Sequence, residues 1–194
     1  MLKKTSVPQE EVYPPAEDSW LLEECIVRED LRGKKCLDMG CGSGIQSVSL
    51  LRAGAEKVFA VDVNSNALEA TKLRAQKLGH SAGAIIFLRS DLFSSLAPLE
   101  KFDFIAFNPP YVPSEEIKWR DTDGGKKGAE VIEKFVEKVG GRLNKGGVLL
   151  LLLSSLNEPE KILARLKKHG FAGDVAARKK LFFEELIVFR AVKA

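Results

Sequence analysis

The chain has 194 residues and a formal net charge of +3, and it is 45% hydrophobic and 29% charged. This composition predicts a soluble globular protein with a single domain over residues 1–194. The basic residues occur in scattered pairs and form no run, which argues against a polybasic membrane anchor and gives little support for nucleic-acid binding.

The cysteines and the apolar runs indicate the cellular setting. Cys25, Cys36 and Cys41 are odd in number and form no CxxC pair, so neither a disulfide framework nor a metal site is predicted. The first residues show no signal-peptide pattern, and the longest apolar run, 148–153, is far shorter than the roughly 20 residues of a membrane helix. We therefore expect a cytoplasmic protein in which this run is a strand buried on both faces.

Helix and strand patterns follow a loose tail at 1–11. A helix is predicted to begin after Pro14 and Pro15, where acidic residues follow, and to end at Gly33. The remaining patterns predict strands at 34–39, 57–63, 84–89, 102–107, 147–153, 171–180 and 184–193, and helices at 45–53, 66–78, 129–143 and 159–170. This alternation predicts parallel βαβ units, and therefore an α/β fold with a doubly wound, mostly parallel sheet that ends in a hairpin.

A glycine-rich turn, DMGCGSG, joins the first strand of this sheet to the next helix. Gly40, Gly42 and Gly44 allow a sharp turn and the close approach of a ligand. The turn departs from the dinucleotide fingerprint, because Ile45 stands where the last glycine is required. Asp38, just before the turn, would repel phosphates and would suit a cationic ligand such as a sulfonium or an ammonium group.

Two further acids follow the next two strands. Asp62 ends the second strand, where a carboxylate can accept hydrogen bonds from both ribose hydroxyls. Asp91 follows the third strand and can accept from an exocyclic amino group, while the N–H of Leu92 can serve a ring nitrogen. All three acids are expected at the carboxyl edge of the sheet, where such folds bind ligands.

Together, the glycine turn and the spaced acids resemble the class I S-adenosylmethionine-dependent methyltransferases, over roughly 34–194. The resemblance implies a seven-stranded sheet whose last strand runs antiparallel, and S-adenosyl-L-methionine as the cofactor. It also places the ribose at Asp62 and the adenine at Asp91.

The fourth strand leads into Asn108, Pro109, Pro110 and Tyr111. This NPPY motif resembles methyltransferases that act on planar nitrogens: adenine N6, guanine N2 or a glutamine amide. The lone pair of such a nitrogen is delocalised, and two acceptors on its N–H groups would turn that lone pair toward the methyl carbon. We expect the side-chain oxygen of Asn108 and the carbonyl of Pro109, fixed by its ring and by the next proline, to be these acceptors. Tyr111 would stack on the planar group.

The segment VYPPAEDS resembles the HemK-type release factor glutamine methyltransferases, in their short eukaryotic and archaeal branch. The matching residues are Val12, Tyr13, Pro15, Ala16, Glu17, Asp18 and Ser19, and the motif DGGKKG adds Gly124, Gly125 and Gly128. The resemblance implies N5-methylation of the glutamine in the Gly-Gly-Gln loop of a peptide chain release factor. It places the cofactor at Ser19, Asp38, Gly40, Gly42, Gly44, Asp62, Asp91, Leu92 and Asn108, and the substrate at Asn108, Pro109, Tyr111, Tyr13, Gly124 and Gly125. Residues 12–33 would then cover both.

The resemblance also implies a partner, a small zinc-binding Trm112-like activator. Bacterial members carry an N-terminal domain that recognises the release factor. Only some 30 residues precede the first strand here, so we expect that domain to be absent and a partner to supply recognition. The apolar strand 84–89 would lie at a sheet edge that this partner can cover. The family often has Glu where Asp38 stands.

Three other functions stay open at this stage. The NPPY motif permits methylation of a nucleic-acid base amino group, although the low net charge does not favour it. Methylation of another protein residue such as lysine, which needs no paired acceptors, ranks lower. A non-catalytic scaffold that binds the cofactor is opposed by the intact motif.

Overall fold

The computed structural model describes residues 12–81, 83–111 and 129–194. The elements are, in chain order, α1 (Glu17–Ile26), β1 (Lys35–Met39), α2 (Ile45–Arg52), β2 (Lys57–Asp62), α3 (Ser65–Lys77), β3 (Ile85–Arg89), β4 (Phe102–Phe107), α4 (Glu130–Val139), β5 (Leu143–Ser154), α5 (Pro159–Lys168), β6 (Phe171–Lys180) and β7 (Glu185–Lys193). Short 3-10 turns flank β5 at Gly140–Arg142 and Ser155–Asn157.

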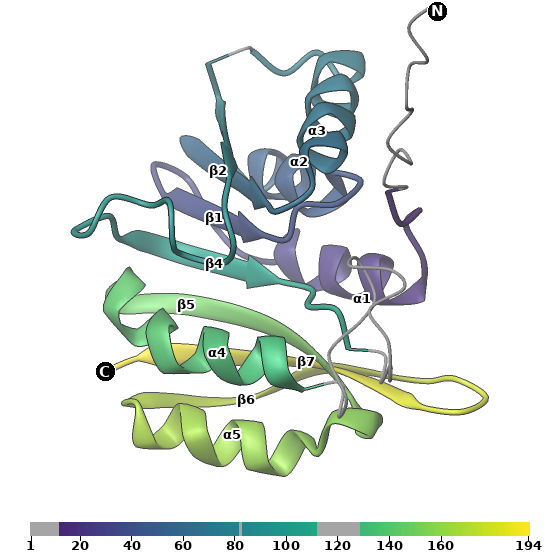
Figure 1. The fold of residues 1–194 in the computed structure, drawn as a ribbon, viewed down its shortest axis with the longest axis vertical. Coiled ribbons are helices and arrows are strands. Elements are labelled where there is room, and N and C mark those ends of the chain that lie inside the picture. The colour runs from purple at the N-terminus through teal and green to yellow at the C-terminus, as the bar shows by residue number, and fades with distance from the viewer. Residues whose placement is uncertain (1–11, 82, 112–128) are drawn as a thin grey trace, which may run out of the picture.

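The strands form one seven-stranded sheet in the order β3-β2-β1-β4-β5-β7-β6, and Figure 1 shows the strands from β2 to β6 one below another. The five strands from β3 to β5 are parallel, and β7 runs antiparallel to both β5 and β6. The predicted fold class, with its antiparallel last strand and closing hairpin, is therefore confirmed. The strand order reverses between β1 and β4, and β3 lies at one edge as predicted.

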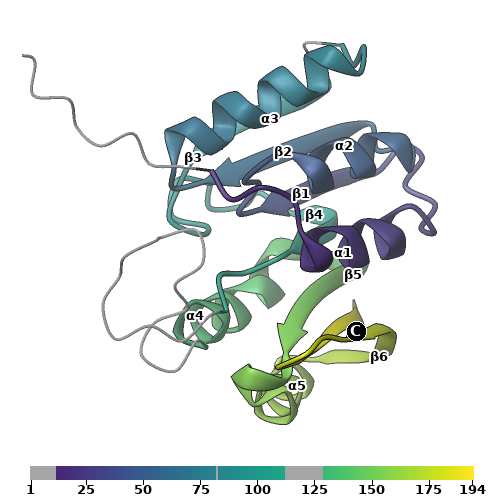
Figure 2. The same ribbon diagram turned by 90° about the vertical axis from the view of Figure 1, so that its right-hand side faces the viewer.

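Helices cover both faces of the sheet (Figures 1 and 2). Helices α1, α2 and α3 pack on one face, and α4 and α5 pack on the other. The leucines of β5 alternate between the two cores: Leu149, Leu151 and Leu153 contact the α4 side, and Leu150 and Leu152 the α1 side. The prediction that the run 148–153 is a strand buried on both faces is confirmed. None of the helices in the described ranges has the length and apolar character needed to cross a bilayer.

Two predicted helix ends are wrong. Helix α1 ends at Ile26, because the next residues form turns (Arg28 N–H to the carbonyl of Cys25, 3.3 Å) and Gly33, at φ +68°, belongs to the turn before β1. Helix α4 ends at Val139, because Gly140 opens a 3-10 turn and β5 already begins at Leu143. The predicted cap of α3 is confirmed, since the side chain of Asn64 accepts a hydrogen bond from the N–H of Asn66.

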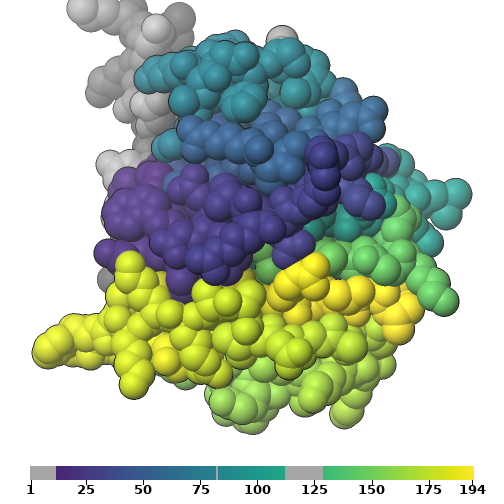
Figure 3. Space-filling view, turned by 180° about the vertical axis from the view of Figure 1, so that it is seen from behind, coloured from purple at the N-terminus to yellow at the C-terminus, as the bar shows by residue number. Residues whose placement is uncertain are grey.

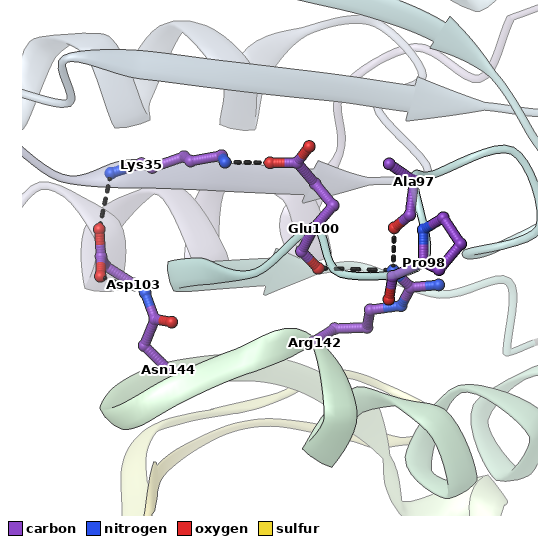
Figure 4. Close-up of polar contacts among 7 residues, drawn as sticks. All are labelled: Lys35, Ala97, Pro98, Glu100, Asp103, Arg142 and Asn144. Carbon is purple, nitrogen blue, oxygen red and sulfur yellow. Dashed lines mark hydrogen bonds and ion pairs between the residues drawn. The ribbon is translucent and has the colours of Figure 1, made fainter.

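A polar network closes the amino ends of the central strands (Figure 4). Asp103 accepts from the N–H of Lys35 at 3.0 Å and from the side-chain amide of Asn144 at 2.8 Å, which ties β4 to β1 and β5. The ammonium of Lys35 pairs with Glu100. The guanidinium of Arg142 donates to the carbonyls of Ala97, Pro98 and Glu100. These contacts hold the loop between β3 and β4 at its far end and leave its beginning at the opposite, carboxyl edge of the sheet.

Candidate functional site

A cavity of about 520 Å³ opens at the carboxyl ends of the parallel strands. It brings together most of the predicted site residues: Tyr13, Ser19, Gly40, Gly42, Asp62, Asp91, Leu92, Asn108, Pro109, Pro110 and Tyr111. Residues without an earlier assignment also line it: Asp18, Met39, Cys41, Ser43, Gln46, Val61, Val63, Ser90, Phe107 and Val131. Gly124 and Gly125 lie outside the described residues, so their predicted role stays a prediction.

The strand register explains why these residues meet. Met39 pairs with Val61 of β2 on one side and with Phe107 of β4 on the other. The residues that follow these three, Gly40, Asp62 and Asn108, therefore lie side by side at the carboxyl ends of the strands. Figure 2 views the sheet from this edge. The cavity thus lies at the point where the strand order reverses, which is the usual ligand site of a doubly wound sheet.

The glycine turn forms the floor of the cavity next to Asn108. Gly40 has φ +66°, and a Cβ added there would lie 3.6 Å from the ring of Phe107 and 3.9 Å from the carbonyl oxygen of Asn108. The N–H of Gly42 donates to the carboxylate of Asp62 at 3.0 Å. Because glycine leaves this surface bare and Asp62 holds the turn in place, the backbone is ready for close contact with a ligand.

Gly44 does not line the cavity, and its predicted contact with the cofactor stays a prediction. It has φ +80° and begins α2, and a Cβ at this position would lie only 2.6 Å from the Cα of Thr71 on α3. Gly44 therefore serves the close packing of α2 against α3.

Asp38 also lies off the cavity surface, behind the glycine turn, with 1% of its surface exposed. Its predicted contact with a cationic ligand stays a prediction, and the burial of the carboxyl favours an effect through the turn. The hydroxyl of Ser47 donates to the carboxyl of Asp38 at 2.5 Å. Burial, opposed by this hydrogen bond and reinforced by the charge of Asp62, raises the pKa of Asp38 to about 7. A cation bound at the glycine turn would attract this carboxyl electrostatically, across the backbone of the turn.

The start of the β3–β4 loop presents an unpaired donor. Leu92 has φ +48°, a left-handed conformation that costs a residue with a side chain on the order of 1 kcal/mol. Among the described residues, nothing accepts a hydrogen bond from its N–H. The hydroxyl of Ser90 accepts from the N–H of Ser95 at 2.9 Å, which holds the turn in shape. This strained geometry beside Asp91 suits a donor and an acceptor set to recognise a flat heterocycle.

Asn108 is held in one orientation by Asp18. Its Nδ2 donates to Oδ2 of Asp18 at 3.1 Å, whereas its Oδ1 is buried and has no hydrogen-bond partner within the described part of the chain. The Asp18 carboxylate, 5% exposed, also accepts from the N–H and the hydroxyl of Ser19 at 2.6 and 3.2 Å. An orphan buried oxygen is costly unless a ligand satisfies it, so it marks a binding position.

Asp18 is the residue that sequence reasoning left without a role. It lies in the family-like segment 12–19, but an acid in the first turn of a helix is ordinarily explained by the helix dipole. Only the folded chain, which brings the start of α1 next to the end of β4, shows that its carboxylate reaches Asn108.

Tyr111 closes the motif as a neutral phenol. Its hydroxyl donates to Asp18 at 3.5 Å, and Asn157 donates to its carbonyl at 2.8 Å. Burial, and then the charges of Asp18 and Glu184, raise the pKa of Tyr111 far above its ordinary value, and the same causes raise that of Tyr13. Both rings therefore stay uncharged and can pack against a flat substrate group.

Two acceptors of the motif receive no hydrogen bond from the described part of the chain. One is Oδ1 of Asn108, and the other is the carbonyl of Pro109, to which no described residue donates. Such a pair fits the two N–H bonds of an amide or an aryl-amino group. No cluster of three or more metal-ligating side chains occurs among the residues that the structure describes.

Comparison with known proteins assigns this fold and site to a family. The model of the methyltransferase small domain matches residues 17–181. The chain belongs to that family. Within it, this methyltransferase is 41% identical over 187 residues to a Methanocaldococcus jannaschii protein provisionally named as a protein N5-glutamine methyltransferase, with 93% of the chain and 91% of the relative covered. The predicted HemK-type family is confirmed.

Two solved structures extend the comparison. The E. cuniculi Mtq2–Trm112 complex, described as responsible for methylation of the termination factor eRF1, aligns with a TM-score of 0.74 and 32% identity over 94% of this methyltransferase and 99% of that chain. The Thermus thermophilus (T. Thermophilus) 16S rRNA N2 G1207 methyltransferase, in complex with AdoMet and guanosine, aligns with a TM-score of 0.69 and 25% identity over 93% of this chain and 44% of that one.

Proposed function

We propose that this methyltransferase transfers a methyl group from S-adenosylmethionine to the side-chain amide nitrogen of the glutamine in the Gly-Gly-Gln loop of a peptide chain release factor. The observation that carries the proposal is the buried Oδ1 of Asn108, which no described residue satisfies and which Asp18 fixes beside the glycine turn. The names of the relatives support a glutamine substrate and a termination factor.

The residues of the cavity fit S-adenosylmethionine, which supplies an electrophilic methyl group when bound. Asp62 would accept from the ribose hydroxyls, Asp91 from the adenine amino group, and the N–H of Leu92, which no described residue engages, would donate to a ring nitrogen. The bare backbone at Gly40 and Gly42 would lie against the amino-acid part of the molecule, and Ser19 and Tyr13 would cover it from the N-terminal segment 12–33.

In this proposal the chain catalyses the reaction mainly by positioning. Oδ1 of Asn108 and the carbonyl of Pro109 each accept one N–H of the glutamine amide, so the nitrogen lone pair points away from both oxygens. Tyr111 supports one face of the amide group. Orientation of this kind, together with fixed dipoles, can lower a barrier by several kcal/mol without a covalent intermediate.

A partner subunit completes the proposal. Strand β3 is an edge strand, and its Ile86 is 40% exposed. An apolar edge with free backbone groups suits pairing with a strand or loop of another protein. We propose that a small zinc-binding Trm112-like activator covers this edge, and that the complex works in the cytoplasm, where translation terminates. The E. cuniculi Mtq2–Trm112 complex supports this assignment.

The test is transfer of labelled methyl groups to a purified release factor, with and without the activator. We expect label on the native factor and none on a factor whose loop glutamine is replaced by alanine. Label on both factors, or on neither, would refute the proposal.

A second candidate is methylation of a base amino group, which the likeness to the 16S rRNA enzyme favours. The same two acceptors fit such a nitrogen. Ribosomal RNA as the methyl acceptor, with an affinity that falls steeply with salt because phosphates are neutralised on binding, would favour this candidate.

A further inference from the structure

The turn of the β6–β7 hairpin carries two aromatic side chains in open solvent. Phe182 is 92% exposed and Phe183 is 86% exposed, and their rings meet edge to face with centroids 4.6 Å apart. The turn is closed by the N–H of Leu181, which donates to the carbonyl of Glu184 at 2.8 Å. Two adjacent phenylalanines exposed on a projecting turn are costly in water unless they meet another molecule.

We infer that this turn, residues 181–184, is a docking element for the protein substrate, with Phe182 and Phe183 as its anchors. The inference rests on the proposed function, and it names how the same site selects a protein that carries the target glutamine. Figure 3 shows the hairpin, in yellow, extending beyond the body of the molecule below α1.

The turn lies at the edge of the sheet where the cavity opens. Ser154, the last residue of β5, pairs with Leu186, so the hairpin continues past the end of β5 on the side where β4 ends before Asn108. Strand β7 is two strands from β4, which corresponds to roughly 10 Å. The charge of Glu184 reaches Tyr13 and Tyr111, both of which line the cavity.

A macromolecular substrate must therefore touch this turn or pass close to it. When a glutamine on a loop enters the cavity as far as Asn108, the surface around that loop comes against the rim. The partner surface that fits is an apolar depression on a folded protein, beside the glutamine loop, that accepts two phenyl rings.

The base of the hairpin is fixed, so the rings are presented without a large ordering cost. The hydroxyl of Ser154 donates to Glu184 at 2.5 Å, and Lys179 pairs with Glu17 at the start of α1. Arg178 pairs with Glu185 at 2.8 Å. Because two of the three basic residues at 178–180 are already paired with acids, the charge here favours an apolar protein surface over a phosphate backbone.

The test compares a double variant, Phe182→Ala with Phe183→Ala, with the control Leu99→Ala. Leu99 is 89% exposed but lies before β4, at the opposite end of the sheet. Steady-state methylation of intact release factor is measured for each, with the activator present throughout, and binding of S-adenosylhomocysteine is measured by calorimetry. We expect the double variant to raise KM for the release factor at least 10-fold, with kcat and the S-adenosylhomocysteine Kd within about twofold of the unaltered enzyme, and the control to change none of them.

The outcomes distinguish failure of this inference from failure of the proposed function on which it rests. An unchanged KM in the double variant overturns the inference alone. If the double variant bound S-adenosylhomocysteine as poorly as it bound the release factor, the rings would be shown to support the fold. If it no longer bound the activator, or no longer bound RNA, the turn would be assigned to that partner. Each of these results overturns docking of the protein substrate. Absence of glutamine-dependent labelling by the unaltered enzyme would instead overturn the proposed function and this inference with it.

Discussion

The carboxylate of Asp18 accepts a hydrogen bond from Nδ2 of Asn108 at 3.1 Å, and it thereby decides which atom of that amide is left unsatisfied. A primary amide can rotate by 180° and exchange its donor and acceptor at little cost in shape. A buried anion on the nitrogen side removes that freedom, because the reversed amide would place an oxygen against a carboxylate. The site thus holds an acceptor at a set position before any substrate arrives.

Truncation of Asp18 should therefore lower turnover without loss of the cofactor. We expect Asp18→Ala to reduce kcat by about 10- to 100-fold, because Asn108 can then rotate. Asp18→Asn should recover part of the loss, since its amide oxygen can still accept from Nδ2. Glu24→Ala, on the exposed face of the same helix, is the control. A matching loss of S-adenosylhomocysteine affinity in Asp18→Ala would contradict this positioning role.

Removal of the acceptor itself should have a larger effect. Asn108→Ala is expected to lower kcat by about 100-fold or more, because the substrate amide loses one of its two oriented hydrogen bonds. Calorimetry with S-adenosylhomocysteine should give a Kd close to that of the unaltered enzyme. A normal kcat with weakened cofactor binding would place Asn108 in the cofactor site alone.

Asp62→Ala should show the reverse pattern. This variant removes the proposed ribose acceptor and also leaves the N–H of Gly42 without its 3.0 Å partner, so the glycine turn loosens. We expect the Kd for S-adenosylhomocysteine to rise by at least 10-fold, in line with the loss of hydrogen bonds to a charged group. Unchanged calorimetric affinity would exclude Asp62 from the cofactor site.

Asp38 should make stability and cofactor binding depend on pH. Burial raises its pKa from an ordinary 3.8 to about 7, so between these values the folded chain holds a proton that the unfolded chain has released. The contribution of Asp38 to the free energy of unfolding of the free enzyme is therefore fully present at low pH, and it is lost as the pH rises from about 4 to about 7. Asp38→Asn should abolish this decline and unfold at a higher temperature than the unaltered enzyme at pH 8.

Cofactor binding should respond to the same carboxyl with the opposite sign. Ionised Asp38 attracts a cation, so S-adenosylmethionine should bind more tightly as pH rises through 7, and this trend should vanish in Asp38→Asn. Thermal unfolding and calorimetry at pH 5 and pH 8 measure both effects. Parallel pH profiles for the two proteins would show that Asp38 does not titrate in this range.

The edge of β3 provides a test of the proposed partner. Ile86→Glu places a charge on the exposed edge and should abolish co-purification with the activator while leaving S-adenosylhomocysteine binding intact. Val27→Glu is a matched control, because Val27 is 49% exposed and follows α1, which packs against α2 and the β5 to β6 side of the sheet. Equal retention of the activator by both variants would place the interface elsewhere.

Local chemistry made most of the fold predictable. The unbroken run of leucines at 149–153 is typical of a strand in the interior of a sheet. The acids at the carboxyl ends of β2 and β3 lie at the edge where a doubly wound sheet binds its ligands. The packing between distant segments was not predictable. The motif places Gly44 in the ligand turn, but the structure shows that any side chain at this position would collide with Thr71, 27 positions further along the chain. Asp18 and Asn108 are 90 residues apart, and no local pattern shows their contact.

The pairing of two oxygens, from Asn108 and Pro109, has a consequence for how this enzyme could change its target over time. In the proposed reaction these atoms would recognise a flat nitrogen with two hydrogens, a feature shared by protein amides and nucleobases. The central chemistry is therefore indifferent to the identity of the macromolecule, and discrimination falls to the outer surfaces that guide it inward. During evolution the enzyme could acquire a new substrate through changes in a projecting turn or in its partner subunit, while the residues around the transferred methyl group stayed the same.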